Sequence, residues 1–440
     1  MEIERYRIMN HFHKYATYTF SLLLSLVAAS CHKDEPAPTP SLPKTTDTAI
    51  LLYAVASNDL APNFYDDLQE MEIGLEKVDL SKVDYYVYSV TAALDGAPSL
   101  KMAVRNPQTG SVEFEEVKSY DRSASSASPD RISEVISDFS DLTDSSTKGL
   151  ILWSHSSAWA PAPATKTRNL APSASSTDFI TTSDGYTLGK IQPTEMKWWG
   201  VDIDYDANTR TYCNLPDLAS AIPDRYFNFI WFDCCYMSSI EVIYEMRNKA
   251  EMFVAYPTEV LAEGAPYNIV VPFIATSKPN LIAAADAMSD YYLTGNKIFT
   301  MAVIDVSPIE EIADLAAKAI PGERLPAHKL QKYSRSGYYF YDFGQYTSSW
   351  GATLGEDWDA DEFNRLMDRM VVYKNCGDRL FSGATLNKTN YSGISCGYFS
   401  YNPDDPKADK EVDAEDQKYY LELEWFKRVY EPYWPAMNQK

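Results

Sequence analysis

Short apolar runs and polar segments with helix-like spacing alternate along most of the chain. Each apolar run has the length of a buried strand. The runs cover residues 49–56, 83–90, 150–153, 227–232, 250–255 and 300–306. Helical spacing recurs at Phe64, Leu68 and Met71, and over residues 131–139, 215–222, 240–247 and 309–320. This alternation predicts an α/β fold with a mainly parallel sheet and helices on both of its faces.

Two stretches depart from the alternation. Residues 100–104 and 112–117 predict a β-hairpin, because Gly110 lies in the turn between them. From about residue 321, tyrosines crowd the sequence and charge-rich helices are expected to close the chain. The chain is therefore expected to hold a main domain and a C-terminal subdomain, over residues 47–320 and 321–440.

The first residues, 1–30, have the pattern of a secretion signal. Basic residues precede an apolar run over 18–29, which is short for a membrane span. The letters VAASC, which end at Cys31, resemble a bacterial lipobox and predict lipidation of that cysteine; ordinary cleavage after small residues is the alternative. A Pro-rich tether follows over 31–46. We expect an exported protein with a lipid anchor in the outer membrane, and the acidic residues at 33–35 are similar to a cell-surface signal.

Charge and cysteine content narrow the function. The 440-residue chain has a net charge of −23, which argues against a nucleic-acid partner because such partners bind basic surfaces. Besides Cys31 there are five cysteines, an odd number without metal-type spacing, so at least one thiol is expected to be free. A disulfide framework is not required by this pattern.

Two of the apolar runs end in residues that can carry chemistry. The run 150–153 leads into His155, and the run 227–232 leads into Asp233, Cys234 and Cys235. If the two strands are neighbours, they lie about 5 Å apart and bring an imidazole and a thiol to one sheet edge. A histidine can take the proton of a thiol and later protonate a leaving amine. The alternative is that these cysteines and this histidine only pack.

The two segments also match a known family. Residues 150–159, LILWSHSSAW, and residues 232–237, FDCCYM, resemble the signature segments of clostripain-like cysteine peptidases, which read LILWNHGSGW and FDACLMG. The resemblance covers roughly residues 49–320. It implies a caspase-like fold and a Cys/His dyad that cleaves peptide bonds after Arg or Lys through a thioester acyl-enzyme. Peptides or proteins with Arg or Lys at the cleavage site are the implied partners, and no cofactor is required.

Carried over residue by residue, the resemblance gives Cys235 as the nucleophile and His155 as the base. Asp233 matches the acid beneath the pocket for the substrate's basic side chain, although a strand-end or helix cap would explain it too. Glu263 lies in a segment similar to the one that supplies a second pocket acid, and Glu259 competes with it for this role.

Several positions depart from the family pattern. Ser156 and Ala158 replace glycines, Ser154 replaces an asparagine, and Cys234 replaces an alanine. The backbone N–H groups of Ser156 and Cys235 are the expected oxyanion donors, and a serine adopts a glycine-only conformation only at a steric cost. A second hypothesis follows, in which the chain is an inactive caspase-like domain kept as a surface binding module.

Residues 160–176 form a Pro/Ala/Ser/Thr-rich segment that contains Lys166 and Arg168. Family members can be activated by cleavage between the His and Cys strands, so we predict self-cleavage at these two residues. A tolerated surface insertion is the alternative.

Two further motifs suggest other chemistry only weakly. Asp202, Asp204, Asp206 and Asn208 alternate as in a calcium loop, but its glycine and final acid are missing. A solvated turn explains them better, and a calcium requirement stays open. Residues 393–397 match the serine-hydrolase elbow GxSxG. No histidine follows His328, which disfavours that fold because its histidine comes after the serine.

Overall fold

A computed structural model describes the greater part of the chain. The described residues are 46–91, 97–159, 179–181, 187–189, 199–204, 209–320, 329–333, 340–397 and 420–433. They lie in one compact unit, which runs from Pro43 to the end of the chain. The predicted secretion signal, lipidation site, cleavage loop and tether as far as residue 45, with Cys31, Lys166 and Arg168, lie outside the described residues.

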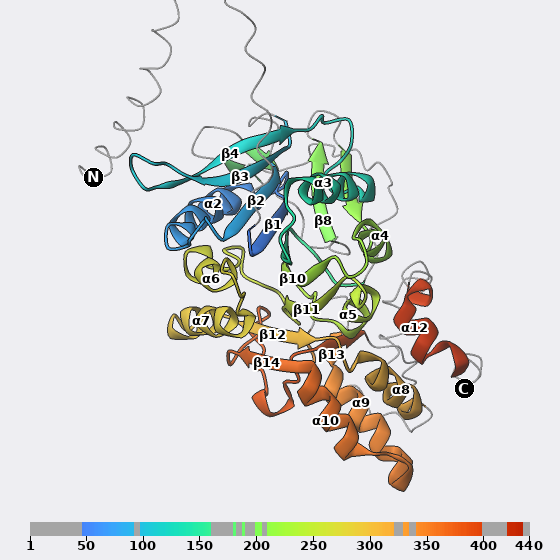
Figure 1. Cartoon of the computed structure of the whole chain (residues 1–440). Helices are drawn as coiled ribbons and strands as arrows, with labels where there is room; N and C mark the ends of the chain where they lie inside the picture. The colour runs from blue at the N-terminus through green and yellow to red at the C-terminus, as the bar shows by residue number, and fades with distance from the viewer. Residues whose placement is uncertain are drawn as a thin grey trace, which may run out of the picture. The chain divides into compact units, whose positions relative to one another are not determined.

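A nine-stranded sheet organises this unit (Figure 1). The strand order is β14-β12-β11-β10-β5-β1-β2-β3-β4. Neighbouring strands are parallel from β11 to β2, and the strands at both edges are antiparallel. Their bounds are β1 Thr48–Val55, β2 Val83–Val90, β3 Ser99–Arg105, β4 Val112–Ser119, β5 Thr147–Trp153, β10 Phe227–Asp233, β11 Ala250–Ala255, β12 Thr300–Asp305 and β14 Val371–Cys376. The mainly parallel sheet and the β3–β4 hairpin are confirmed.

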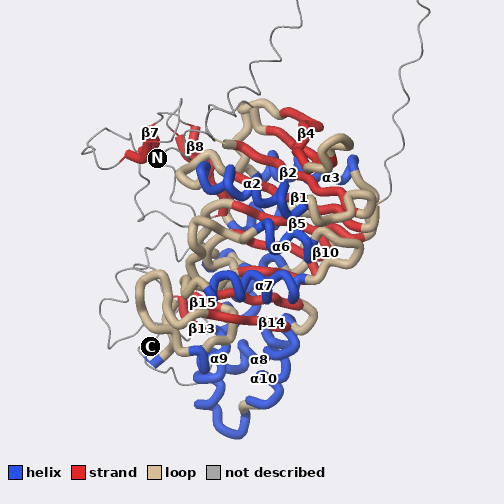
Figure 2. The backbone as a smooth tube through the Cα atoms, turned by 90° about the vertical axis from the view of Figure 1, so that its left-hand side faces the viewer, coloured by secondary structure: helices blue, strands red, loops and turns tan. Residues whose placement is uncertain are grey.

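Side chains of the central strands alternate between two apolar layers, as the period of a strand requires. In β1, Leu51 and Tyr53 enter one layer, while Ile50 and Leu52 enter the other. The first layer is completed by α3 Pro129–Leu142, α4 Leu215–Ala221, α5 Ile240–Met246 and α8 Ile309–Ala319. The second is completed by α2 Ala61–Leu75, α6 Tyr267–Ile274 and α7 Leu281–Thr294. Helices therefore cover both faces, as predicted (Figure 2).

The described elements beyond residue 321 extend the main sheet and one of its apolar layers. Strand β14 pairs with β12 at the edge of the main sheet. The other elements are β13 Phe340–Asp342, α9 Phe343–Gly351, η4 Ala352–Asp357, α10 Ala360–Met370, η5 Lys388–Asn390, β15 Ser395–Gly397, α12 Glu424–Val429 and η7 Glu431–Tyr433. Residues of α9, α10 and α12 belong to the same apolar layer as α8. The division into two domains at residue 320 stays a prediction.

Two short hairpins lie between β5 and α4. They are formed by β6 Phe179–Thr181 with β7 Thr187–Gly189, and by β8 Trp199–Asp204 with β9 Thr209–Cys213. The expectation of a solvated turn at Asp202 and Asp204 is wrong, because both residues lie on β8. Asp202 is also held by the N–H of Ser126 at 2.7 Å. Asp206 and Asn208 lie outside the described residues. Within the described residues, no helix has the length and apolarity that a membrane crossing needs.

Candidate active site

The two reactive strand ends are neighbours in the sheet. β5 and β10 pair in parallel, and Asp233 lies opposite Trp153 in their register. His155 and Cys235 each follow two residues later, so both leave the sheet at the carboxyl ends of adjacent strands. The predicted adjacency of these strands is confirmed. Their edge is where ligands bind in parallel sheets of this kind.

The thiol of Cys235 is held by the segment that follows β11. The backbone N–H of Val260 donates to Sγ of Cys235 at 3.3 Å. Burial, together with the charges of Glu259 and Asp233, raises the pKa of Cys235 to about 12. In this conformation the sulfur is therefore a thiol at neutral pH, and attack requires its conversion to a thiolate.

Asp233 is buried beneath the same segment. One carboxylate oxygen accepts from the N–H of Ala265 at 3.0 Å and from the hydroxyl of Tyr267 at 2.8 Å. Gly264 has a φ of +53°, and a Cβ there would lie 2.8 Å from that oxygen, so only glycine fits this close approach. Burial raises the pKa of Asp233, although these hydrogen bonds oppose the shift.

The two candidates for a second pocket acid lie in different surroundings. Glu259 is buried, and its charge acts on the thiol of Cys235. Glu263 is exposed and pairs with Lys297 at 2.9 Å. Glu263 nevertheless lines a pocket, together with Asp67 of α2.

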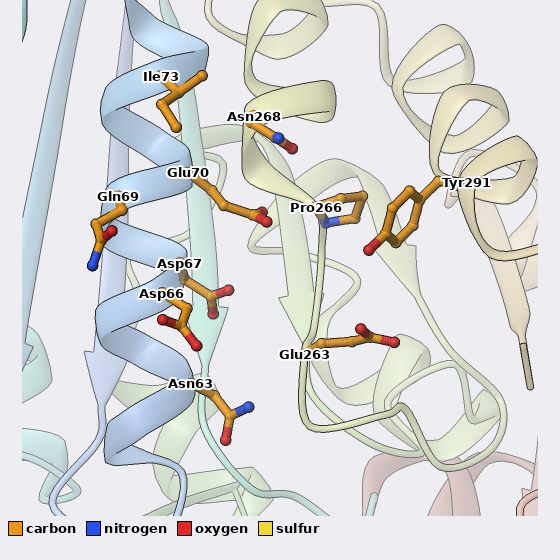
Figure 3. Close-up of a pocket in the computed structure, with 10 residues that line it drawn as sticks. All are labelled: Asn63, Asp66, Asp67, Gln69, Glu70, Ile73, Glu263, Pro266, Asn268 and Tyr291. Atoms are coloured by element: carbon orange, nitrogen blue, oxygen red, sulfur yellow. The ribbon is translucent and has the colours of Figure 1, made fainter. Parts of the chain in front are cut away.

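The pocket that Glu263 lines is strongly acidic. Its volume is about 410 Å³, and it lies between α2, α7 and the segment before α6. Asp66, Asp67 and Glu70 line it from α2, and Figure 3 shows Asp67 and Glu70 directed toward the segment that carries Glu263. Four carboxyl groups around one cavity favour a cationic guest.

Asp67 links this pocket to Asp233. Its carboxylate accepts from the indole N–H of Trp153 at 2.8 Å, and its side chain is buried. Burial, and after it the charge of Asp233, raise the pKa of Asp67 to about 9. Sequence reasoning missed Asp67, which lies 86 residues before its indole partner. An acid within the helix predicted from Phe64, Leu68 and Met71 was the available clue.

The imidazole of His155 has an acidic partner that sequence reasoning also missed. Nε2 of His155 lies 2.8 Å from Oδ1 of Asp59, in the loop between β1 and α2. The side chains are 19% and 30% exposed, so the pair is accessible at the sheet edge. The position of Asp59, three residues after the first apolar run, was a clue in the sequence.

The serines that replace family residues connect the strand ends. The hydroxyl of Ser156 donates to the backbone carbonyl of Cys235. The hydroxyl of Ser154 donates to the carbonyl of Val55 at 2.8 Å and accepts from the N–H of Val201 at 3.2 Å. These bonds tie the histidine loop to its neighbours on both sides.

Backbone conformation places strain beside both reactive residues. Ala158 and Tyr236 have φ values of +61° and +64°, in the region that favours glycine. Ser156 is not among the described residues with positive φ, so its replacement of a glycine brings no left-handed strain. Strain of this kind persists where the surrounding structure fixes it, and it clusters at functional sites.

A metal site and a serine-hydrolase nucleophile are not found among the described residues. Among the described residues, no group of three or more His, Cys, Asp or Glu side chains is arranged to hold a metal ion. Ser395 of the GxSxG motif is buried in β15, and its hydroxyl contacts the carbonyl of Ser238 at 3.2 Å. All five described cysteines, which include Cys376 and Cys396, are free.

Comparison with known proteins identifies the family. The profile of the clostripain family matches residues 52–187 and 184–378. The chain belongs to the clostripain family of cysteine peptidases. No curated protein is similar enough to count as a match.

Solved structures of clostripain-family relatives share the fold. One is a secreted C11 cysteine protease from Bacteroides thetaiotaomicron in complex with an irreversible peptide inhibitor; identity is 21%, the TM-score is 0.68, and the match covers 88% of this chain and 99% of the other. Another is an inactive zymogen C11 protease from Parabacteroides distasonis, with 23% identity, a TM-score of 0.67, and coverage of 89% and 100%. At these identities the likeness establishes the mostly parallel, caspase-like architecture.

Proposed function

We propose that this clostripain-family protein is an endopeptidase that cleaves after Arg or Lys, with Cys235 as nucleophile and His155 as general base. The observation that carries the proposal is the register of β5 and β10, in which Trp153 and Asp233 lie opposite each other, each two residues before a reactive residue. Neighbouring strands are about 5 Å apart, which is within reach of an imidazole and a thiol.

The reaction follows from these groups. His155 accepts the thiol proton, and Sγ of Cys235 attacks the scissile carbonyl carbon to form a C–S bond and an oxyanion. The backbone N–H groups of Cys235 and Ser156 are the proposed donors to that oxyanion. As the C–N bond breaks, His155 returns its proton to the leaving amine. Water then attacks the thioester carbon while His155 accepts a proton from it; the C–S bond breaks, the acid is released, and His155 returns the proton to the sulfur.

Specificity for a basic side chain is proposed to come from buried acid. Asp233, two residues before the nucleophile, would pair with the guanidinium or ammonium group, and Glu263 would add negative charge nearby. Charge pairs in a buried pocket are strong because water screens them little. Since Ala265 and Tyr267 hold Asp233 here, substrate entry requires this segment to move.

Self-cleavage at Lys166 or Arg168 would supply that movement. The segment between His155 and Cys235 has the required basic residues, and the thiol and Asp233 are both engaged by internal groups in the conformation described. Gel analysis tests the idea. The wild type should yield two fragments, whereas Cys235→Ala and the Lys166→Ala/Arg168→Ala double variant should stay intact. Identical single bands for all three would exclude self-cleavage.

Peptide hydrolysis tests the main proposal. Matched fluorogenic peptides with Arg, Lys, Ala or Glu at the cleavage site should be cut only after Arg or Lys. Cys235→Ala and His155→Ala should each lower kcat by about 10³-fold or more. An enzyme that cuts none of the four, even after limited proteolysis, would instead support the inactive binding module.

The site of action is proposed to be the outer membrane, through a lipid on Cys31. The lipobox-like letters before Cys31 support this location. A Cys31→Ser variant should lose labelled fatty acid and move from the membrane to the soluble fraction. Equal labelling of both forms would exclude the anchor.

A further inference from the structure

The loop that carries Asp59 is held rigidly against the histidine strand. The buried side-chain amide of Asn58 donates to the carbonyls of Val55 at 2.9 Å and Val201 at 2.8 Å. Its carbonyl oxygen accepts from the N–H of Leu60 at 2.9 Å. Asp59 lies between these anchored residues, so its position is fixed before any substrate binds.

A second set of bonds fixes the same loop to β8. The hydroxyl of Ser57 donates to the carbonyl of Ile203 at 2.8 Å, and the N–H of Ile203 donates to the carbonyl of Ser57 at 2.9 Å. The hydroxyl of Ser154, directly before His155, donates to the carbonyl of Val55 at the end of β1. The residues on both sides of the Asp59–His155 pair are thus bonded to the same framework.

We infer that Asp59 is a positioning residue for the proposed reaction, which orients the imidazole of His155 and stabilises its protonated form. The 2.8 Å contact uses Nε2, and Nδ1 is the nitrogen proposed to exchange a proton with Cys235. A carboxylate bonded to the far nitrogen of a catalytic histidine selects its tautomer and stabilises the imidazolium. This inference rests on the proposed function and extends its dyad by a third member.

The electrostatics around the pair are consistent with this role. Burial raises the pKa of Asp59, but the hydrogen bond and charge of His155 outweigh burial and hold the pKa below its usual value. Arg210 of β9 also acts on Asp59 in the same direction. Glu259 and Asp233 act on the thiol of Cys235, the proposed partner of the imidazole. Asp59 is therefore a carboxylate through the neutral range.

Rate profiles from about pH 5 to pH 10 test the inference on the processed full-length enzyme. Asp59→Asn keeps the shape but removes the charge. It should lower kcat about tenfold and move the acidic limb of kcat/KM down by about one pH unit, because His155 must be unprotonated to accept the thiol proton and loses its own proton more readily without the carboxylate. Asp59→Ala also loses orientation and should lower kcat about 100-fold. KM should change less than about twofold, since Asp59 does not touch the substrate.

Two controls make the outcome decisive. Asp368→Asn, exposed on α10, should leave kcat and the profile unchanged.

Carbethoxylation of His155 by diethyl pyrocarbonate at about pH 6, mapped by mass spectrometry, needs no turnover and should be at least about threefold faster in Asp59→Asn. If no peptide is cut but carbethoxylation accelerates, the proposed function fails while the Asp59–His155 coupling stands. An unchanged profile, or an unchanged carbethoxylation rate, would overturn the inference.

Discussion

The backbone N–H of Val260 lies 3.3 Å from Sγ of Cys235, and five residues later the N–H of Ala265 lies 3.0 Å from the carboxylate of Asp233. One short segment thus engages both the proposed nucleophile and the proposed specificity acid. The conformation described is therefore a closed one, and substrate must replace these internal donors.

The closed thiol should react slowly with alkylating reagents. Because burial raises the pKa of Cys235 to about 12, very little thiolate is present at neutral pH. In the uncleaved protein, iodoacetamide should modify Cys235 at least about 100-fold more slowly at pH 7 than a free cysteine peptide, and the rate should keep rising beyond about pH 9. Mass spectrometry measures the rate, and Cys234→Ala removes the adjacent thiol as a control. A plateau near pH 8.5 would contradict the closed thiol.

Asp67 should make the protein less stable as pH rises. Its folded pKa of about 9 lies far above the value of an unfolded aspartate, so the stability that its proton contributes is fully present below about pH 4 and is lost as pH rises toward 9. Asp67→Asn, which can still accept the Trp153 hydrogen bond, should raise the free energy of unfolding by about 1–3 kcal/mol at pH 8 and little at pH 4.

Urea denaturation at the two pH values checks this prediction. Asp66→Asn is the control, because Asp66 is an exposed neighbour on the same helix and should show no such pH-dependent gain. Equal effects of Asp67→Asn at both pH values would show that Asp67 is ionised in the folded protein.

Phe340 connects the two reactive loops from the C-terminal part of the chain. Its ring stacks on Tyr236, the strained residue after the nucleophile, with centroids 4.9 Å apart, and lies 6.0 Å from Trp159 of the histidine loop. Phe340→Ala should cost about 3–5 kcal/mol of stability and also lower kcat about tenfold in protein that remains folded.

A matched truncation separates these two effects. Phe343→Ala removes a buried ring that contacts Phe363 and Trp425 instead of the reactive loops. It should lower thermal stability to a similar extent but leave kcat of the folded protein unchanged. Equal losses of kcat in both variants would mean that Phe340 acts only through stability.

Much of the sheet could be predicted from the sequence, because its central strands are apolar on both faces and stand out as short continuous runs. The predicted run 83–90 coincides with β2, and 250–255 with β11. Helix α6 was missed, since it is apolar almost all round and contains Pro272, so it has no polar face to mark its period.

The site was only half predictable for a related reason. His155 and Cys235 follow strands whose apolar pattern marks where chemistry can occur. Asp59 and Asp67 reach the same edge only because β1 pairs with β5, across 96 and 86 residues of sequence. Nothing local to either aspartate indicates a partner so far along the chain.

Covalent labelling tests the central claim most directly. A lysyl chloromethyl ketone should place a single adduct on Cys235 of the processed wild-type protein, located by mass spectrometry. His155→Ala should be labelled at least about 100-fold more slowly, because the thiolate loses its partner. The account predicts this adduct and this dependence; no adduct after limited proteolysis, or an adduct on another residue, would contradict it.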